Sequence, residues 1–112
     1  FQKIIQEFGS KPSDIKVAIG PAIHRESYIF DDLLQKNSKA WRKYVKKLSD
    51  GRLSVDLIGY TKEQLTIFGI NPKNIFNSGV DTAKDQRFYS HYRYSRTKSG
   101  DESRFVCVVG LR

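Results

Sequence analysis

The 112-residue chain contains no methionine, one cysteine, one tryptophan and two histidines. A single cysteine, Cys107, excludes an intrachain disulfide and a cysteine-rich metal site, and a reducing, cytoplasmic setting is the simplest interpretation. No hydrophobic run approaches the length of a membrane span, so we expect no membrane partner. Because the chain opens within a helical pattern and shows no leader, we expect it to be a piece of a longer protein.

The chain does have an excess of positive charge and enough hydrophobic residues for a core. Its formal net charge is +8, and 38% of its residues are hydrophobic and 12% aromatic. This composition is typical of one small folded unit over residues 1–112 rather than of a disordered chain. The charge favours acidic partners such as phosphate, nucleotide or nucleic acid, although a well-solvated basic surface explains it equally well.

Hydrophobic periodicity predicts alternating helices and strands, and therefore an α/β fold. We expect helices over residues 1–8, 31–48 and 57–68. We expect strands over residues 15–19, 53–57, 75–78 and 105–111, the last of them central because it is apolar on both faces. Residues 28–30 fit either a short strand or the entrance to a helix capped by Asp31.

Several positions refine these elements. Gly9 and Gly69 follow two of the expected helices, where a left-handed residue commonly ends a helix, and Asp50-Gly51 signals a turn. The helix over residues 1–8 has one apolar face, made by Phe1, Ile4, Ile5 and Phe8. In the helix over residues 57–68 the expected core residues are Ile58, Leu65 and Phe68.

The cysteine and histidines of this chain, residue types often used in catalysis or metal binding, form no recognisable site motif in the sequence. Cys107 stands between valines in an apolar strand, so we expect it to be an unreactive core residue. His24 and His91 are far apart in the sequence and lack a paired cysteine or histidine at ligand spacing. We therefore expect two loop or surface histidines and no zinc site made by this chain alone.

Polar residues follow two of the expected strands. The strand over residues 15–19 runs into Gly20-Pro21 and a polar loop that ends at Tyr28, and Asp81-Thr82 follows the strand over residues 75–78. Side chains at the carboxyl ends of strands are well placed to bind a ligand in α/β proteins. An aspartate that simply caps the next turn is at least as good an explanation of Asp81.

The segment from Phe88 to Arg104 mixes aromatic and basic residues. Aromatic rings with guanidinium groups suit a nucleobase carrying a ribose or phosphate, and also single-stranded nucleic acid. A solvated basic loop pinned by its aromatic residues is equally consistent. The basic residues around Trp41 to Lys47 fit the outer face of the expected helix, so groove binding to nucleic acid is not favoured.

Taken together, these segments resemble the YfiH family, also called laccase-domain or polyphenol oxidase proteins. Val17-Ala-Ile-Gly-Pro-Ala-Ile23 with Tyr28 is similar to the family's I-G-P-x-I-x-x-x-x-Y motif. Asp81-Thr82 followed by Phe88-Tyr-Ser-His-Tyr-Arg93 resembles its [CD]-T…F-F-S-[YH]-R-R motif. Two further segments are similar to the family's sequences. Between the motifs these are Val55-Asp56-Leu57 with Gln64-Leu65, and at the end of the chain Arg104-Phe105 with Val108-Val-Gly-Leu111.

The resemblance implies a layered mixed β-sheet with flanking helices, of which residues 1–112 would be the C-terminal portion, incomplete without the N-terminal half. It implies a zinc-dependent purine nucleoside phosphorylase with adenosine deamination alongside, and purine nucleoside and phosphate as partners. The family's zinc ligands, one cysteine and two histidines, would precede this chain, so the chain alone would be inactive. The substrate-side wall would consist of Tyr28, Asp81, Thr82, Ser90 and Arg93.

The resemblance also gives these residues roles. Tyr28 would pack or stack, Asp81 and Thr82 would hydrogen-bond ribose or shape the strand end, and Ser90 with Arg93 would hold an oxyanion. Tyr92-Arg93 stands where the family has two consecutive arginines, and Gly100 is separated from Arg104. The alternatives are a small basic module for RNA or single-stranded DNA and a non-catalytic structural fragment.

Overall fold

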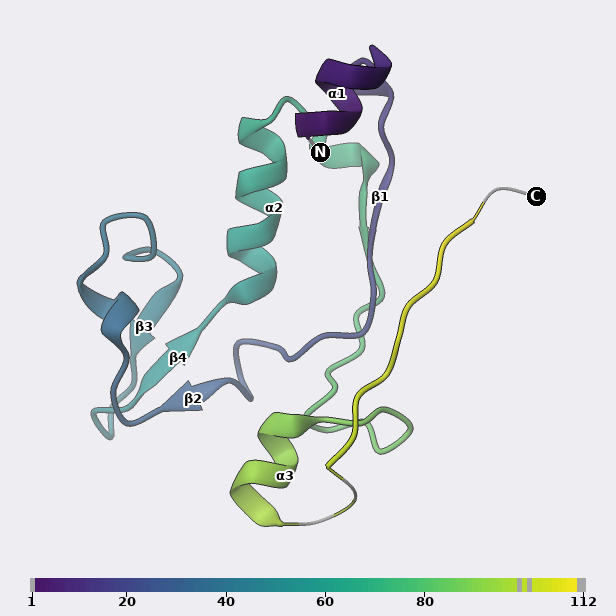
Figure 1. Cartoon of the computed structure of the whole chain (residues 1–112). Coiled ribbons are helices and arrows are strands. Elements are labelled where there is room, and N and C mark those ends of the chain that lie inside the picture. The colour runs from purple at the N-terminus through teal and green to yellow at the C-terminus, as the bar shows by residue number, and fades with distance from the viewer. Residues whose placement is uncertain (1, 99, 101, 111–112) are drawn as a thin grey trace.

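A parallel pair of strands organises the chain. The computed structural model describes residues 2–98, 100 and 102–110 (Figure 1). Strand β1 (Val17–Ile19) lies parallel to β5 (Ile75–Asn77), with Ala18 opposite Phe76. Parallel strands need a crossover connection, and here it is the whole of residues 20–74, which carries the other sheet and the longest helix.

The second sheet is antiparallel, with β4 (Leu53–Val55) between β2 (Ile29–Phe30) and β3 (Val45–Lys47). The β3–β4 connection is tight because Leu48 N–H donates to the Arg52 carbonyl at 2.8 Å and Gly51 takes a φ of 87°. The expected turn at Asp50-Gly51 is therefore confirmed. Of the two alternatives for residues 28–30, the structure has the short strand, at Ile29–Phe30. Parallel and antiparallel pairing thus occur in two separate small sheets of a mixed α/β fold.

Three α-helices lie among the described residues: α1 (Gln2–Phe8), α2 (Leu57–Ile67) and α3 (His91–Thr97). Helices α1 and α2 end as the sequence predicts, because Gly9 and Gly69 take φ values of 64° and 88°. Short 3₁₀ turns occupy Pro12–Asp14, Leu34–Asn37 and Pro72–Asn74. No helix in the described part of the chain is long and apolar enough to cross a membrane.

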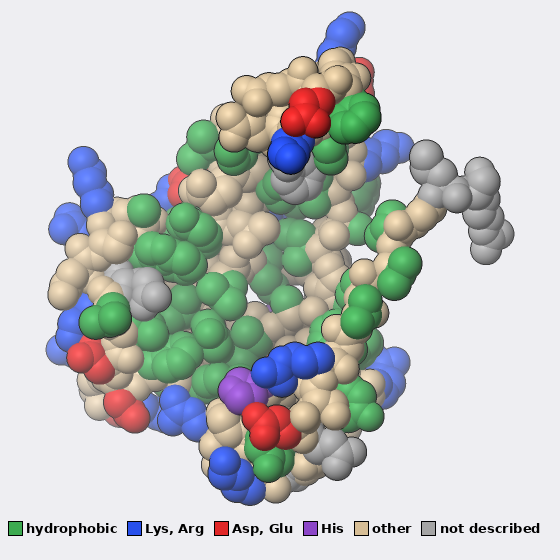
Figure 2. Space-filling view, in the orientation of Figure 1, with side chains coloured by type: hydrophobic (Ala, Val, Ile, Leu, Met, Phe, Trp, Pro, Cys, Tyr) green, Lys and Arg blue, Asp and Glu red, His purple; other side chains and the backbone are tan. Residues whose placement is uncertain are grey.

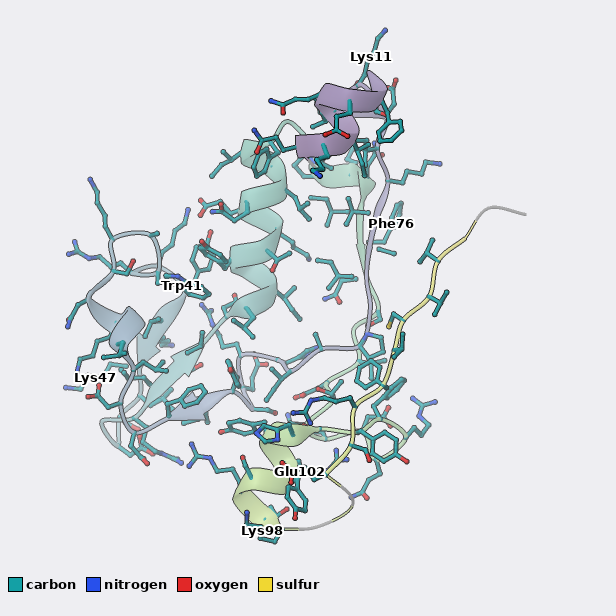
Figure 3. The ribbon with its side chains drawn as sticks, viewed as in Figure 1. Lys11, Trp41, Lys47, Phe76, Lys98 and Glu102 are labelled. Carbon is teal, nitrogen blue, oxygen red and sulfur yellow. The ribbon has the colours of Figure 1, made fainter. Side chains whose placement is uncertain are left out.

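The buried core is thin. Among the described residues only Ile70, which follows α2, is almost fully buried, at 1% exposure, and Leu65 of α2 and Val55 of β4 are the next most enclosed of the hydrophobic residues. Trp41, labelled in Figure 3, stacks on the Tyr60 ring of α2 with 4.0 Å between ring centroids. Of the expected α2 core residues, Leu65 is buried but Phe68 is 47% exposed.

The expected helix over residues 31–48 is wrong. A 3₁₀ turn and further turns cover residues 34–44, and β3 follows. The spacing of the hydrophobic residues suited a helix, but pairing with β4 aligns Val45 with Val55 and satisfies the backbone of β3. Tertiary pairing has overridden the local pattern here. The basic residues from Trp41 to Lys47 are therefore not on one helix.

The expected central strand at residues 105–111 is also wrong for the residues described; Leu111 lies outside them. Residues 102–110 run without strand pairing, and Val106, Val108 and Val109 are 83–94% exposed. Cys107 is exposed rather than a core residue, although its Sγ lies close to Gly20. The apolar face of α1 is exposed as well at Ile4 and Phe8, while Phe1 lies outside the described residues. No described strand pairs with the C-terminal segment, which packs on the rest of the chain through Phe105 against Phe88 and through Cys107 near Gly20.

The start of α2 yields a stability prediction. The Asp56 side chain caps the helix by accepting from Gly59 N–H at 2.7 Å, and a Cβ at Gly59 would lie 2.5 Å from the Asp56 carboxylate. Gly→Ala within a helix usually stabilises by about 1 kcal/mol. We expect Gly59→Ala to destabilise instead, by about 1 kcal/mol, because it displaces the cap.

Urea unfolding of the single variants and the double variant measures this effect. In an Asp56→Ala background the carboxylate is absent, so we expect Gly59→Ala to become neutral or stabilising. A destabilisation of the same size in both backgrounds would contradict the displaced cap.

Candidate functional site

The loop after β1 and the segment after β5 meet at Asp81. Pairing continues beyond the strands, because Ala22 N–H donates to the Val80 carbonyl and Thr82 N–H donates to the Ala22 carbonyl, both at 3.1 Å. This places residues 20–28 against residues 80–83 at the carboxyl ends of the parallel pair. The sequence predicted that both segments follow strands, and the fold brings them together.

The Asp81 carboxylate is the centre of this meeting. One oxygen accepts from the backbone N–H groups of His24 at 3.3 Å and Ala83 at 3.0 Å, and the other accepts from the Ser27 hydroxyl at 2.5 Å. The residue is only 9% exposed. The carboxylate therefore bonds to its own turn at Ala83, as the capping interpretation predicted. It also bonds to the loop after β1, at His24 and Ser27.

Burial is the largest single influence on the pKa of Asp81, and it raises it. The hydrogen bonds from Ser27 and from the two backbone N–H groups together outweigh burial, so the pKa of Asp81 lies below its ordinary value of 3.8. The group is ionised at neutral pH and shapes the strand end as an acceptor.

Helix α3 carries two of the expected site residues. Ser90 caps the helix by accepting from Arg93 N–H, and it is 7% exposed. The Arg93 guanidinium donates to the carbonyls of Thr82 at 2.7 Å, Phe88 at 2.8 Å and Asp85 at 3.3 Å. These bonds hold residues 82–88 in place. The oxyanion role expected for Ser90 and Arg93 stays a prediction.

The same segment holds a surface ion pair. Side-chain hydrogen bonds from Arg87 are the main reason that the pKa of Asp85 is lowered to about 2. The pair is exposed, so it is screened and adds little stability. The Arg87 guanidinium is paired with Asp85 at the surface. The Arg93 guanidinium instead bonds to the backbone carbonyls of residues 82–88.

Tyr28 belongs to an aromatic cluster on the other side of the site. Its ring packs edge-on against Phe30 and Tyr92, with centroids 4.6 and 5.4 Å away. A hollow of about 80 Å³ opens beside it, lined by Tyr28, Phe30, Leu33, Trp41, Val55 and Leu57. This is below the ~300–1,000 Å³ of typical ligand pockets, so it holds a small apolar group and not a whole nucleoside.

A second hollow, of about 200 Å³, is polar and lies at the loop after β1, lined by His24, Arg25, Glu26, Asp56, Ile58 and Asn77. Arg25 contacts the Asp56 carboxylate at 3.5 Å. The buried nitrogens His24 Nε2 and Arg25 Nε have no hydrogen-bond partner among the described residues. Buried polar atoms normally have hydrogen-bond partners. These two nitrogens therefore leave the loop with places for hydrogen bonds to atoms from outside the described residues.

The described residues do not fit a metal ion. None of them forms a group of three histidine, cysteine, aspartate or glutamate side chains able to hold one. His91 contacts Glu102 at 3.4 Å, His24 lies in the loop after β1, and Cys107 lies near Gly20. Zinc and copper sites need several such donors in one place.

The structure brings Asp81, Thr82, Ser90 and Arg93 into one region, and their role there stays a prediction. Two further residues that the sequence does not assign to the site, Ser27 and Tyr92, contribute contacts. Ser27 carried no signal, because its importance depends on reaching a carboxylate 54 positions away. Tyr92 was noted only as a departure from the resembled motif, yet its hydroxyl bonds the backbone of Ile29 in β2. Tyr28 lies in the aromatic cluster, joined to the Asp81 region through the loop after β1.

Fold and site together define a mixed α/β protein with polar residues gathered at the carboxyl ends of a parallel strand pair. The chain belongs to the family described as multi-copper polyphenol oxidoreductase laccase, whose pattern matches residues 1–111. The resemblance to YfiH proteins is thereby confirmed.

Two solved structures are similar to the chain. Bacillus licheniformis hypothetical protein YfiH is 28% identical with a TM-score of 0.66, over 82% of this chain and 37% of that one. YlmD from Geobacillus stearothermophilus is 29% identical with a TM-score of 0.68, over 82% of this chain and 36% of that one. The chain thus spans little more than a third of these proteins' length. No curated protein sequence matches it.

The Asp81 network predicts a pH-dependent stability. Because the pKa of Asp81 is lowered on folding, its stabilisation is complete above the unfolded pKa and is lost as the pH falls through the folded pKa. We expect Asp81→Asn to cost about 1 kcal/mol at pH 7, the usual value of one hydrogen bond. The difference in unfolding free energy between Asp81→Asn and the unchanged protein should become smaller as the pH falls below 3.8, the ordinary pKa of an aspartate.

Urea unfolding at several pH values between neutral and acidic measures this difference. Asp31→Asn is the matched control, since Asp31 is exposed and outside the network. A gap for Asp81→Asn that stays constant down to acidic pH would contradict the assigned ionised acceptor.

Proposed function

We propose that this chain is the C-terminal part of a single YfiH-like domain and supplies the substrate-side wall of a purine nucleoside phosphorylase. The observation that carries the proposal is the meeting of the two motif segments at Asp81, where residues 20–28 and 80–83 form one polar site. Ligands of open α/β sheets bind outside the carboxyl ends of the strands. Purine nucleoside and phosphate are the proposed substrates, and adenosine deamination is the accompanying activity.

The amount of exposed hydrophobic surface supports an incomplete domain. Phe8, Ile67, Phe76 and the valines of the C-terminal segment are more than half exposed, and Figure 2 shows hydrophobic side chains gathered across the middle of one face. Soluble proteins rarely leave so much apolar surface uncovered. The two solved structures are nearly three times as long as the part of them that this chain covers. The proposed N-terminal half covers this surface.

The contacts refine the role of each wall residue. Asp81, Ser90 and Arg93 already bond to the protein, so in this proposal they build the wall and set its shape. Thr82 is 6% exposed, and the bonds that join it to Ala22 and Arg93 use its backbone and not its hydroxyl. Its backbone is fixed on both sides, because its N–H donates to Ala22 and its carbonyl accepts from Arg93. The Thr82 hydroxyl is therefore the group proposed to hydrogen-bond the ribose.

The proposed enzyme takes its zinc ligands from the N-terminal half. The described residues of this chain do not assemble a metal site, and the resemblance places one cysteine and two histidines before it. A zinc ion can activate water or polarise a leaving group when bound. In this proposal the present chain orients the nucleoside and leaves the metal to the other half.

The wall role predicts the effect of removing one hydroxyl. In the full-length protein we expect Thr82→Val to raise the KM for purine nucleoside about tenfold, the usual cost of one lost hydrogen bond. The melting temperature should stay the same, because the Thr82 backbone bonds are retained. Thr61→Val, on the exposed side of α2, is the matched control and should leave both values unchanged. An unchanged KM in the Thr82 variant would rule out the ribose contact.

The incomplete-domain proposal predicts how the chain behaves when purified alone. We expect residues 1–112 to bind no stoichiometric zinc and to show no phosphorolysis of purine nucleosides, since both need the other half. Metal analysis and a phosphate-dependent nucleoside assay measure the two properties, with the full-length protein as the positive control. One zinc per isolated chain would overturn the proposed location of the ligands.

A further inference from the structure

The outer edge of β2 is closed by a side chain instead of a strand. On the inner side, Val55 N–H of β4 donates to the Tyr28 carbonyl at 3.0 Å. Neighbouring residues of a strand direct their backbone groups to opposite sides, so the N–H and carbonyl of Ile29 face away from β4. Both groups would be unpaired at an open edge, which normally invites another strand.

Tyr92 from α3 meets both of these groups with one hydroxyl. Its oxygen accepts from Ile29 N–H at 3.1 Å, and its O–H donates to the Ile29 carbonyl at 2.6 Å. Arg96, one turn later in α3, donates to the same carbonyl at 2.9 Å. The Arg96 guanidinium also lies 5.3 Å from the Tyr92 ring centroid, within cation–π range. Helix α3 thus occupies the place of a fourth strand.

The same tyrosine contacts the rings on either side of Ile29. The Tyr92 ring packs edge-on against Tyr28 at 5.4 Å and against Phe30 at 5.9 Å between centroids. Tyr28 and Phe30 both line the apolar hollow that also contains Trp41. The Tyr92 hydroxyl therefore fixes the backbone of Ile29, which lies between Tyr28 and Phe30. The Tyr92 ring limits the movement of the rings of these two neighbours.

We propose that Tyr92 is a positioning residue that fixes the edge of β2 and, through it, the Tyr28 ring in the wall of the site. The kinetic part of this inference rests on the proposed nucleoside phosphorylase function, and the structural part does not. Phenylalanine at this position would keep the ring contacts and lose both bonds to Ile29. An arginine, which the resembled motif has here, donates hydrogen bonds but cannot accept from the Ile29 N–H.

The test compares Tyr92→Phe with Tyr94→Phe in the full-length protein. Tyr94 lies on the same helix, and its ring contacts Lys98 rather than β2. NMR hydrogen exchange of the Ile29 amide reads the hydroxyl bond directly. We expect about tenfold faster exchange in Tyr92→Phe, an effect of one lost hydrogen bond, with no change in Tyr94→Phe. The Tyr28 ring resonances should shift in the Tyr92 variant alone.

Nucleoside kinetics give the second measurement. We expect Tyr92→Phe to raise the KM about tenfold while kcat changes less than twofold, because a displaced wall weakens binding more than chemistry. Ile29 exchange equal to that of the unchanged protein would overturn the inference, and so would faster exchange with an unchanged KM. If the unchanged protein has no phosphorolysis, the proposed function fails, and the exchange and ring resonances alone decide the role of Tyr92.

Discussion

The Asp81 carboxylate is the constraint on which the arrangement of this chain depends. It joins the loop after β1 to the turn after β5 through the Ser27 hydroxyl and two backbone N–H groups. The strands themselves pair over three residues each, and backbone bonds between Ala22 and residues 80–82 continue the pairing up to this carboxylate. A buried carboxylate is costly unless it is fully hydrogen-bonded, and these donors meet that condition. The bonds bring together, at this polar surface, segments that are more than 50 residues apart in the sequence.

Helix α3 extends this constraint to the antiparallel sheet. Its first turn places neighbouring side chains on two different tasks: Arg93 holds the carbonyls of residues 82–88, and Tyr92 closes the edge of β2. A seven-residue helix is too short to be stable by itself, so these contacts and the Ser90 cap maintain it. The candidate site is consequently a set of backbone positions held by side chains.

The thin core goes together with a large exposed apolar surface. The solved structures similar to this chain are much longer than it is, and its apolar segments leave valines and phenylalanines exposed. The C-terminal segment shows the effect clearly, since a sequence apolar on both faces lies without strand pairing. Its hydrophobic pattern is that of a central strand, and the neighbours such a strand needs are not among the described residues.

Strong local signals in the amino-acid sequence are enough to predict β1, β5, the turn at Gly51 and the ends of α1 and α2 at glycines with positive φ. The sequence also determined the family, and it indicated Asp81, Thr82, Ser90 and Arg93 because motif residues keep their order along the chain. That residues 45–47 are a strand follows only from strand pairing in the folded chain, because the bonds to β4 outweigh a helical spacing. Only the fold could show that Ser27 binds Asp81 and that Tyr92 bonds Ile29, because hydrogen bonds across more than 50 residues leave no local periodicity.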